Sequence, residues 1–445
     1  MDFLLGGIGC IVLLLVLMAL GLQIGLAFIL AGFLVGGLLI GFDSVSSLLG
    51  QTAYYSVATP TWTAIPLFIL MGAFASDGGL AKRAYDGIYV LSRNVRGSLL
   101  IATSVSCGVF GAVSGSSIAT TAIFTRVALP EMLSRGYDRK LSIGCIASAG
   151  TFASMIPPSM MMVIYGLFTQ QSIGKLFAAG LVPGIITVIA YAVLINVMVR
   201  RNPALAPLGT EDMPEEGTPP APSALTRFLR IWPVALISVV VMGGIYAGFF
   251  TPTEAAAVGA VSALAVGWYL KTFRRGKDVV TPMRDAANIT GMLFLINIGA
   301  LFYSRILAIT DLPTEMTMAL SVLNVPPFVV LMIVILLLFF LGMIMVPVGI
   351  YALTLPILVP LLVNLGYDPI WFGVIALKMI EIGAITPPVG LNVFAARGAL
   401  PRNSGISTDD IFRGCVPFLL CEFVVLAILI AFPQFSLWLP NLLFG

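Results

Sequence analysis

The chain has 445 residues, of which 59% are hydrophobic and only 10% are charged, and its mean hydropathy is +1.06. Soluble globular domains carry about 25% charged residues, and disordered chains are polar and rich in charge, so this composition excludes both classes. The sequence contains no histidine, which excludes histidine bases, histidine-dependent triads and histidine-ligated metals. The composition therefore predicts an all-α polytopic membrane protein.

Five cysteines are scattered through apolar stretches without any CxxC spacing. They are Cys10, Cys107, Cys145, Cys415 and Cys421. This pattern predicts small buried hydrophobic side chains and no disulfide framework or zinc site.

Apolar runs of about 20 residues, long enough to cross a bilayer as helices, alternate with short polar breaks. We expect full spans at 3–20, 22–41, 60–76, 141–168, 174–199, 231–250, 254–271, 285–305, 370–396 and 414–439. The start of the chain lacks the basic segment of a cleavable signal peptide, so we expect the first span to be retained.

Lysine and arginine collect on the cytoplasmic side of membrane proteins. If the N-terminus lies outside, all of the 23 Lys and Arg residues except Lys175, Arg305 and Lys378 fall inside, which is 20 residues. The reverse topology would place these 20 residues on the wrong face. We therefore expect both termini to be periplasmic.

The apolar stretch 97–129 has Arg96 before it and the basic segment 126–140 after it, on the same side. A helical hairpin can return to its starting face, and the turn-prone run Ser114–Ser117 lies at its middle. Each arm would measure ~18–25 Å as a helix, too short for a hydrocarbon core of ~30 Å. The alternative is a small-residue face for helix packing, as in GxxxG contacts.

An internal repeat accompanies the hairpin. Pro130 is followed 27 residues later by Pro157–Pro158, and Pro360 is followed 27 residues later by Pro387–Pro388, so one offset of 230 residues relates the two sets. The apolar stretch before the second set, 326–361, has its own break at 342–349. By the topology count this second hairpin enters from outside. We therefore expect an inverted repeat, an architecture common in secondary transporters.

These features divide the chain into seven parts. They are scaffold helices at 1–76, the first hairpin and interrupted helix at 77–173, a scaffold helix at 174–199, a linker at 200–230, scaffold helices at 231–305, the second hairpin and interrupted helix at 306–400, and a C-terminal helix at 401–445. The linker holds six prolines and an acidic cluster, so we expect a solvated, flexible connector.

The two Pro-Pro pairs mark the candidate ion-binding sites. A proline removes a donor and blocks the carbonyl four residues earlier, so Pro157–Pro158 should free the carbonyls of Ala153 and Ser154. Free carbonyls with Ser or Thr hydroxyls suit a hard cation such as Na⁺, and helix N-termini at the hairpin tips suit an anion. The alternative is a kink used only for packing.

Four runs resemble the large membrane (M) subunit of TRAP transporters, the tripartite ATP-independent periplasmic family. They are FTPTEAAAVG at Phe250–Gly259, the tip Ser114–Ser117, PPS within Ile156–Ser159 together with Tyr165–Gly166, and TPPVGLN at Thr386–Asn392. The resemblance covers essentially the whole chain. It implies the translocating subunit of a Na⁺-driven, binding-protein-dependent importer of organic acids in the bacterial inner membrane. The implied fold has two re-entrant hairpins in a moving elevator-type transport domain and a fixed scaffold.

The same resemblance implies a small four-span membrane (Q-type) subunit and a periplasmic substrate-binding (P-type) protein as partners, an organic acid substrate and a lipid bilayer. No nucleic acid, organic cofactor or catalytic residue is expected. Carried onto this sequence, one sodium site would use Ser114, Ser116, Gly150, Ser154 and Pro157, and the second would use Gly342, Thr386, Pro387 and Val389. Substrate would contact Ser116, Ser117 and Asn392, and no metal other than sodium is expected.

One feature departs from the family pattern. Its members often carry an acidic residue just after the glycine of the second tip, where this chain has Met345-Val346-Pro347. The tip is therefore apolar, which favours a less polar acid as substrate.

Lys378 and Glu381 lie three residues apart in a predicted span, where ionisable residues are functional candidates. The alternative is that they neutralise one another. Glu254 forms a capping box with Thr251, which is a structural role, and Arg305 can reach the interface from its span end.

Other function classes fit less well. A stand-alone sodium–carboxylate symporter would share the hairpins and the repeat but need no partners, and only the FTPTEAAAVG-type signatures argue against it. A channel would show a pore-lining ring of charges or carbonyls, and a primary pump would show a GxxxxGK[ST] nucleotide site. An intramembrane enzyme would need a nucleophile and a base. None of these patterns is present in the sequence.

Overall fold

The computed structural model describes residues 3–92, 95–207, 229–312, 315, 318, 325–401 and 404–445, and the regular structure within these ranges is helical. Six of the described helices are long and apolar enough to cross a membrane, or eight if each of two bent pairs forms one span. The chain is therefore a polytopic membrane protein. The predictions that concern Arg93, Arg227, Arg402 and linker residues 208–228, including Glu211, Asp212, Glu215 and Glu216, lie outside the described residues.

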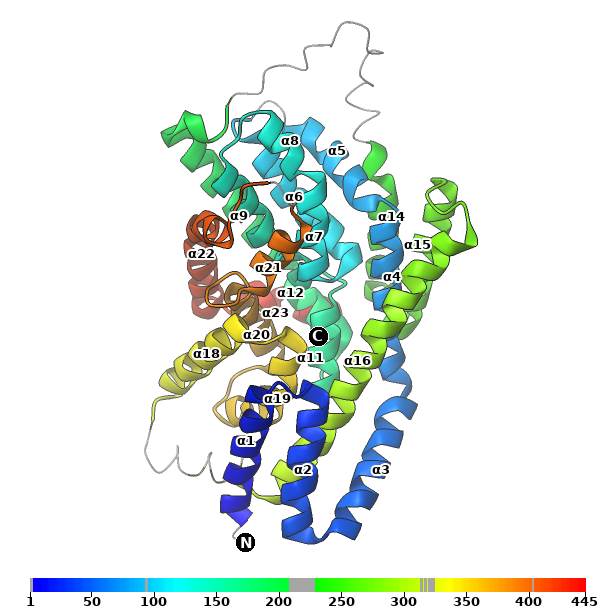
Figure 1. Ribbon diagram of the computed structural model, residues 1–445, viewed down its shortest axis with the longest axis vertical. Coiled ribbons are helices and arrows are strands. Elements are labelled where there is room, and N and C mark those ends of the chain that lie inside the picture. The colour runs from blue at the N-terminus through cyan, green and yellow to red at the C-terminus, as the bar shows by residue number, and fades with distance from the viewer. Residues whose placement is uncertain are drawn as a thin grey trace, which may run out of the picture.

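One group of helices packs around the long helix α16. The group comprises α1 (Phe3–Ala19), α2 (Ile24–Ile40), α3 (Phe42–Ala58), α4 (Ala64–Asp77), α14 (Trp232–Tyr246), α15 (Pro252–Tyr269) and α16 (Gly276–Ile309). Helix α16 has 34 residues, so it is about 51 Å long. It packs against α2, α3 and α4, while α15 packs against α4 and α14. In Figure 1, α16 runs diagonally, with α2 and α3 beside its lower end.

The second group holds both hairpins and both interrupted helices. In the first half these are α5 (Leu80–Ser92), α6 (Ser98–Ser114), α7 (Ser117–Val127), α8 (Leu129–Ser134), α9 (Arg139–Ala149), α10 (Phe152–Met155), α11 (Met160–Thr169) and α12 (Ile173–Arg201). In the second half they are α18 (Pro327–Ile344), α19 (Pro347–Asn364), α20 (Pro369–Gly383), α21 (Leu391–Ala399), α22 (Thr408–Ala431) and α23 (Gln434–Phe444). Helix α12, which the sequence analysis assigned to the scaffold, packs against α6, α20, α22 and α23.

Glycines allow the closest helix crossings. A Cβ atom added to Gly144 of α9 would lie 2.1 Å from the carbonyl carbon of Gly414 on α22. In the other group, a Cβ on Gly299 of α16 would lie 2.4 Å from the carbonyl oxygen of Gly25 on α2. Small residues let helix backbones meet in this way, and the resulting contact area contributes to association within a membrane.

The structure differs from the sequence prediction in three elements. Helix α3 was not expected, because its polar residues lower the hydropathy of 42–58; it and the Pro60–Asp77 segment meet at 58°. The amphipathic helix α5 was also missed, for the same reason. The expected span 414–439 is two helices, because α22 ends at Ala431 and Pro433 cannot continue it.

The capping box predicted at the start of α15 is confirmed. The Thr251 hydroxyl accepts a hydrogen bond from the Glu254 backbone N–H, while the Glu254 carboxylate accepts one from the Thr251 backbone N–H. Four of the five cysteines are buried, as expected, and Cys421 is half-buried. Arg305 donates to the Thr52 hydroxyl of α3 at 2.9 Å.

A buried ion pair connects α20 to α22. The Lys378 ammonium contacts the Glu422 carboxylate, and these side chains are only 4% and 2% exposed. Lys378 also donates to the Thr187 hydroxyl of α12 at 2.9 Å, and the Tyr191 hydroxyl donates to Glu422 Oε1 at 2.8 Å. The ion pair of Lys378 is therefore formed with Glu422 of α22, a distant segment, and not with Glu381.

Removing one member of this pair should strongly destabilise the protein. Lys378→Met would leave the Glu422 carboxylate buried without a counter-ion, at a cost of about 3–5 kcal/mol. The double variant Lys378→Met/Glu422→Leu should recover most of that loss, because no charge remains buried. Unfolding in one detergent, followed by tryptophan fluorescence against denaturant, measures both effects.

Arg413→Met provides the matched control, since the Arg413–Asp409 pair on α22 is 67% exposed on both sides and such pairs contribute little. Additive losses in the Lys378/Glu422 double variant would contradict a coupled ion pair.

Candidate functional site

The first hairpin tip is a two-residue connection between α6 and α7. Helix α6 ends at Ser114, Gly115 has φ +62°, and Ser116 caps α7 by accepting a hydrogen bond from the Ala119 N–H at 3.4 Å. The left-handed conformation favours glycine at position 115. The tip therefore presents three serines on a backbone that reverses direction within the protein.

The first interrupted helix follows as α9, α10 and α11, with a bend of 45° between Arg139–Met155 and Met160–Thr169. The Pro157–Pro158 and Pro387–Pro388 peptide bonds are both cis. The Ser159 hydroxyl donates to the Ser154 carbonyl and accepts from the Met162 N–H at 3.3 Å. The Ser154 carbonyl, expected to be free for a cation, thus already has a protein donor.

Hairpin tip and helix break lie directly against one another. A Cβ on Gly115 would lie 3.1 Å from the Met160 backbone nitrogen, and one on Gly111 would lie 2.5 Å from Ala153 Cα. A Cβ on Gly150 would lie 1.9 Å from the Thr121 hydroxyl oxygen and 3.1 Å from the Ser117 carbonyl oxygen. The fold therefore brings Gly150 and Ser154 beside the serines of the tip.

The second hairpin and the second break meet in the same manner. A Cβ on Gly383 would lie 2.6 Å from the carbonyl carbon of Gly342, and the Gly390 N–H donates to the Met343 carbonyl at 3.3 Å. The Thr386 hydroxyl donates to the Ile382 carbonyl at 2.7 Å. Gly342 and Thr386 thus lie at one tip and break, as expected, while Pro387 is exposed and Val389 half-buried.

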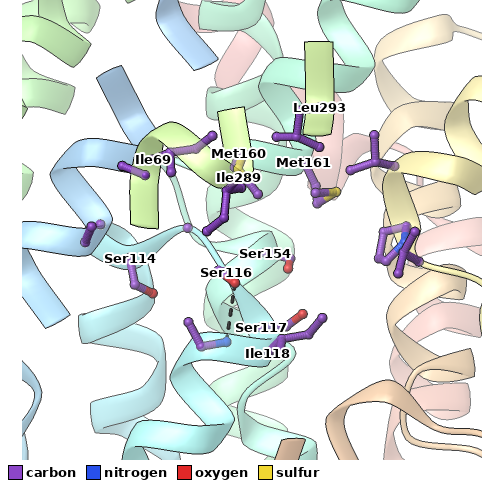
Figure 2. Close-up of a pocket in the computed structure, with 18 of the residues that line it drawn as sticks. Ile69, Ser114, Ser116, Ser117, Ile118, Ser154, Met160, Met161, Ile289 and Leu293 are labelled. Carbon is purple, nitrogen blue, oxygen red and sulfur yellow. Dashed lines mark hydrogen bonds between the residues drawn. The ribbon is translucent and has the colours of Figure 1, made fainter. Parts of the chain in front are cut away.

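A cavity of about 410 Å³ lies between the two groups of helices (Figure 2). The first tip contributes Ser114 to Ser117, and α10, α20 and the second tip contribute Ser154, Glu381 and Val346 to Val348. The opposite wall is mostly apolar and comes from α4 and α16. Its residues include Ile69, Ile289 and Leu293.

The cavity collects some of the predicted residues and leaves others outside. Ser114, Ser116, Ser117 and Ser154 line it, whereas Pro157 and the predicted residues of the second break do not. Asn392 is fully buried on α21, where its Nδ2 donates to the Ala147 carbonyl at 3.4 Å, so it does not line the cavity either.

Sequence reasoning missed two features of this site. The wall formed by α4 and α16 could not be assigned to the tip, because nothing in a helical apolar run indicates its neighbour. Ser159, one residue after the prolines, has the N-cap residue type and could have been recognised as a competitor for the freed carbonyl.

Comparisons with known proteins match this architecture. A family model described as "Tripartite ATP-independent periplasmic transporter, DctM component" matches residues 11–435. The chain belongs to this family. It is a transporter permease component and not an enzyme.

The sequence of this TRAP permease is similar to those of two curated relatives. It is 36% identical over 409 residues to the C4-dicarboxylate TRAP transporter large permease protein DctM of Pseudomonas aeruginosa, covering 91% of each chain. It is 31% identical over 433 residues to the ectoine/5-hydroxyectoine TRAP transporter large permease protein UehC of Ruegeria pomeroyi, covering 97% of each. The YdaH transporter of Alcanivorax borkumensis shares the fold, with a TM-score of 0.64 at 15% identity over 89% of this chain and 90% of that one.

Adding a methyl group at the close contact between the first tip and the first break should impair this TRAP permease. Gly150→Ala places a methyl group against Thr121, at a cost of about 1–3 kcal/mol, and should lower both the thermal midpoint and uptake in cells. Thr121→Ala in the same chain removes the closest atom and should restore part of both. Uptake assays and thermal unfolding of the purified variants measure the two effects.

Gly291→Ala is the matched control, because nothing lies within 4 Å of the added Cβ on α16. A fully active and stable Gly150→Ala variant would show that the tip can move away from the break without loss.

Proposed function

We propose that this chain is the translocating subunit of a sodium-driven importer that receives an organic acid anion from a periplasmic binding protein. The observation that carries the proposal is the cavity in which the serine tip of the first hairpin and the break at Ser154 face α4 and α16. Hydroxyls and backbone amides at a helix start suit a carboxylate, and hydroxyls and carbonyls at a break suit Na⁺.

The two sodium sites are proposed at the two tip-and-break contacts. The first would use Ser114, Ser116, Gly150, Ser154 and Pro157, with hydroxyl oxygens in place of the occupied Ser154 carbonyl. The second would use Gly342, Thr386, Pro387 and Val389. Substrate would enter the cavity beside Ser116 and Ser117, and Asn392 would support the tip through α9.

An elevator motion is consistent with the packing. The wall of α4 and α16 is mostly apolar, with Ser76 and Asp285 as its polar residues, whereas the four serines of the first tip and break and Glu381 of α20 lie on the other side. A group of helices that carries most of the polar residues of its site can move along such a wall with few polar contacts to break. We therefore propose that the two hairpins and the two interrupted helices form the transport domain and that α1–α4 and α14–α16 form the scaffold.

The proposal also includes the orientation of the chain in the membrane and its partner proteins. The basic segments of α5, α8 and α9 lie at one end of the molecule, and the N-terminus lies at the other (Figure 1). We infer that the basic end is cytoplasmic and the N-terminus periplasmic, in the bacterial inner membrane. The tripartite family description supports a small Q-type membrane subunit and a P-type binding protein as the other components.

Reconstitution tests sodium coupling and partner dependence together. Proteoliposomes that hold the chain with its small subunit should take up labelled organic acid only with the binding protein outside and an inward Na⁺ gradient. Replacing Na⁺ by choline at constant ionic strength should reduce uptake to background. Uptake in choline would refute sodium coupling, while Na⁺-driven uptake without the binding protein would favour the stand-alone symporter.

The apolar second tip should set substrate preference. Val346 lines the same cavity as the serines, so Val346→Asp would place a carboxylate where the substrate binds. We expect uptake of the native acid to fall about tenfold or more, since like charges in a partly dry cavity repel, and preference to shift toward a more polar acid.

Competition assays with mono- and dicarboxylates measure this preference, and Val346→Leu controls for the change of shape. Unchanged uptake and unchanged preference in Val346→Asp would contradict the assignment of this tip to substrate.

A further inference from the structure

Glu381 is a buried acid that the proposed sites do not use. It lies on α20, is 2% exposed and lines the cavity between the tip and the scaffold wall. Its Oε1 accepts a hydrogen bond from the Ser117 hydroxyl at 3.2 Å, whereas its Oε2 is buried and has no hydrogen-bond partner. One carboxylate oxygen is therefore unsatisfied at the edge of the cavity.

Glu381 also has no ion-pair partner of its own among the described residues. Lys378, one turn earlier, is held by Glu422 and by the Thr187 hydroxyl. Within the described ranges, no lysine or arginine forms an ion pair with Glu381. A buried carboxylate without a counter-ion is costly, so a ligand that supplies positive charge at this position would be bound favourably.

The neighbouring oxygens define what that ligand is. The Ser117 hydroxyl donates to the carboxylate, and Ser117 and Ser154 both line the cavity beside it (Figure 2). A carboxylate with hydroxyl oxygens is the donor set preferred by hard cations. The three side chains come from α20, α7 and α10, so the tertiary structure alone assembles them.

We propose that Glu381 is the anionic ligand of a coupling Na⁺ ion, which it binds together with the hydroxyls of Ser117 and Ser154. The inference rests on the proposed sodium coupling and gives the first sodium site a charged ligand. It also places one ligand from the second half of the chain in the site of the first half.

This arrangement explains how a cation controls an anionic substrate. Without a bound cation, the Glu381 carboxylate repels a carboxylate substrate that shares its cavity. Bound Na⁺ removes the repulsion, and by linkage the substrate raises the affinity for Na⁺ by the same factor. Each ligand thus strengthens the binding of the other.

Sodium-dependent stabilisation of the purified transporter tests the proposal without a transport assay. The complex of large and small subunits is heated at increasing NaCl concentrations, with choline chloride holding the ionic strength constant. We expect Glu381→Gln to raise the half-saturating Na⁺ concentration for stabilisation at least about tenfold and Ser117→Ala to raise it about threefold. Glu254→Gln, the same exchange at an exposed capping box that also accepts glutamine, should leave it unchanged.

The outcomes separate the two levels of the proposal. Wild-type dependence on Na⁺ that persists in Glu381→Gln and Ser117→Ala overturns the role of Glu381 and leaves sodium coupling intact. A wild-type protein without any response to Na⁺ overturns sodium coupling and the Glu381 site together. If Glu381→Gln fails to fold, Glu381→Asp replaces it, because a shortened carboxylate should weaken Na⁺ binding while keeping the buried charge.

Discussion

Irregular backbone deep in a membrane protein must be covered by protein or line a wet cavity, and the structure around the two helix breaks depends on this constraint. Each break is covered by a hairpin tip of its own half of the chain. The Ser159 hydroxyl occupies the Ser154 carbonyl in the first break, and the Gly390 N–H bonds to the Met343 carbonyl at the second. Glycines at positions 111, 150, 342 and 383 let these irregular segments touch without intervening side chains.

Charged side chains that are buried in the protein likewise need partners within it. Lys378 and Glu422 join α20 to α22, and Tyr191 and Thr187 of α12 complete their hydrogen bonds. This pairing fixes three helices behind the first break and leaves Glu381, which accepts a hydrogen bond from the Ser117 hydroxyl, without an ion pair among the described residues. Lys378, which forms the buried ion pair, and Glu381, the proposed Na⁺ ligand, are therefore separated by one helical turn of α20.

The cavity joins these elements to the proposed transport cycle. Most of its polar residues belong to the first hairpin tip, the first break and α20, while α4 and α16 supply a largely apolar wall that includes Ser76 and Asp285. In the proposed cycle, a cation bound at Glu381 neutralises that carboxylate before the site moves, so the substrate anion beside the first tip no longer shares the cavity with this second negative charge. This neutralisation lowers the cost of moving the site through a region of low dielectric constant.

The sequence by itself determined the membrane class, the positions of both hairpin turns and both helix breaks, and the family. Those features depend on local properties, namely hydropathy over 20 residues, turn-forming residues and the missing donor of proline. The sequence did not predict α3 or α5, because polar residues hid these helices from a hydropathy reading. Only the tertiary structure decided that Lys378 pairs with Glu422, that Asn392 points toward α9 and that Glu381 meets Ser117. Each of these contacts joins segments far apart in the chain, and spacing along a sequence carries no information about which distant helix supplies a partner.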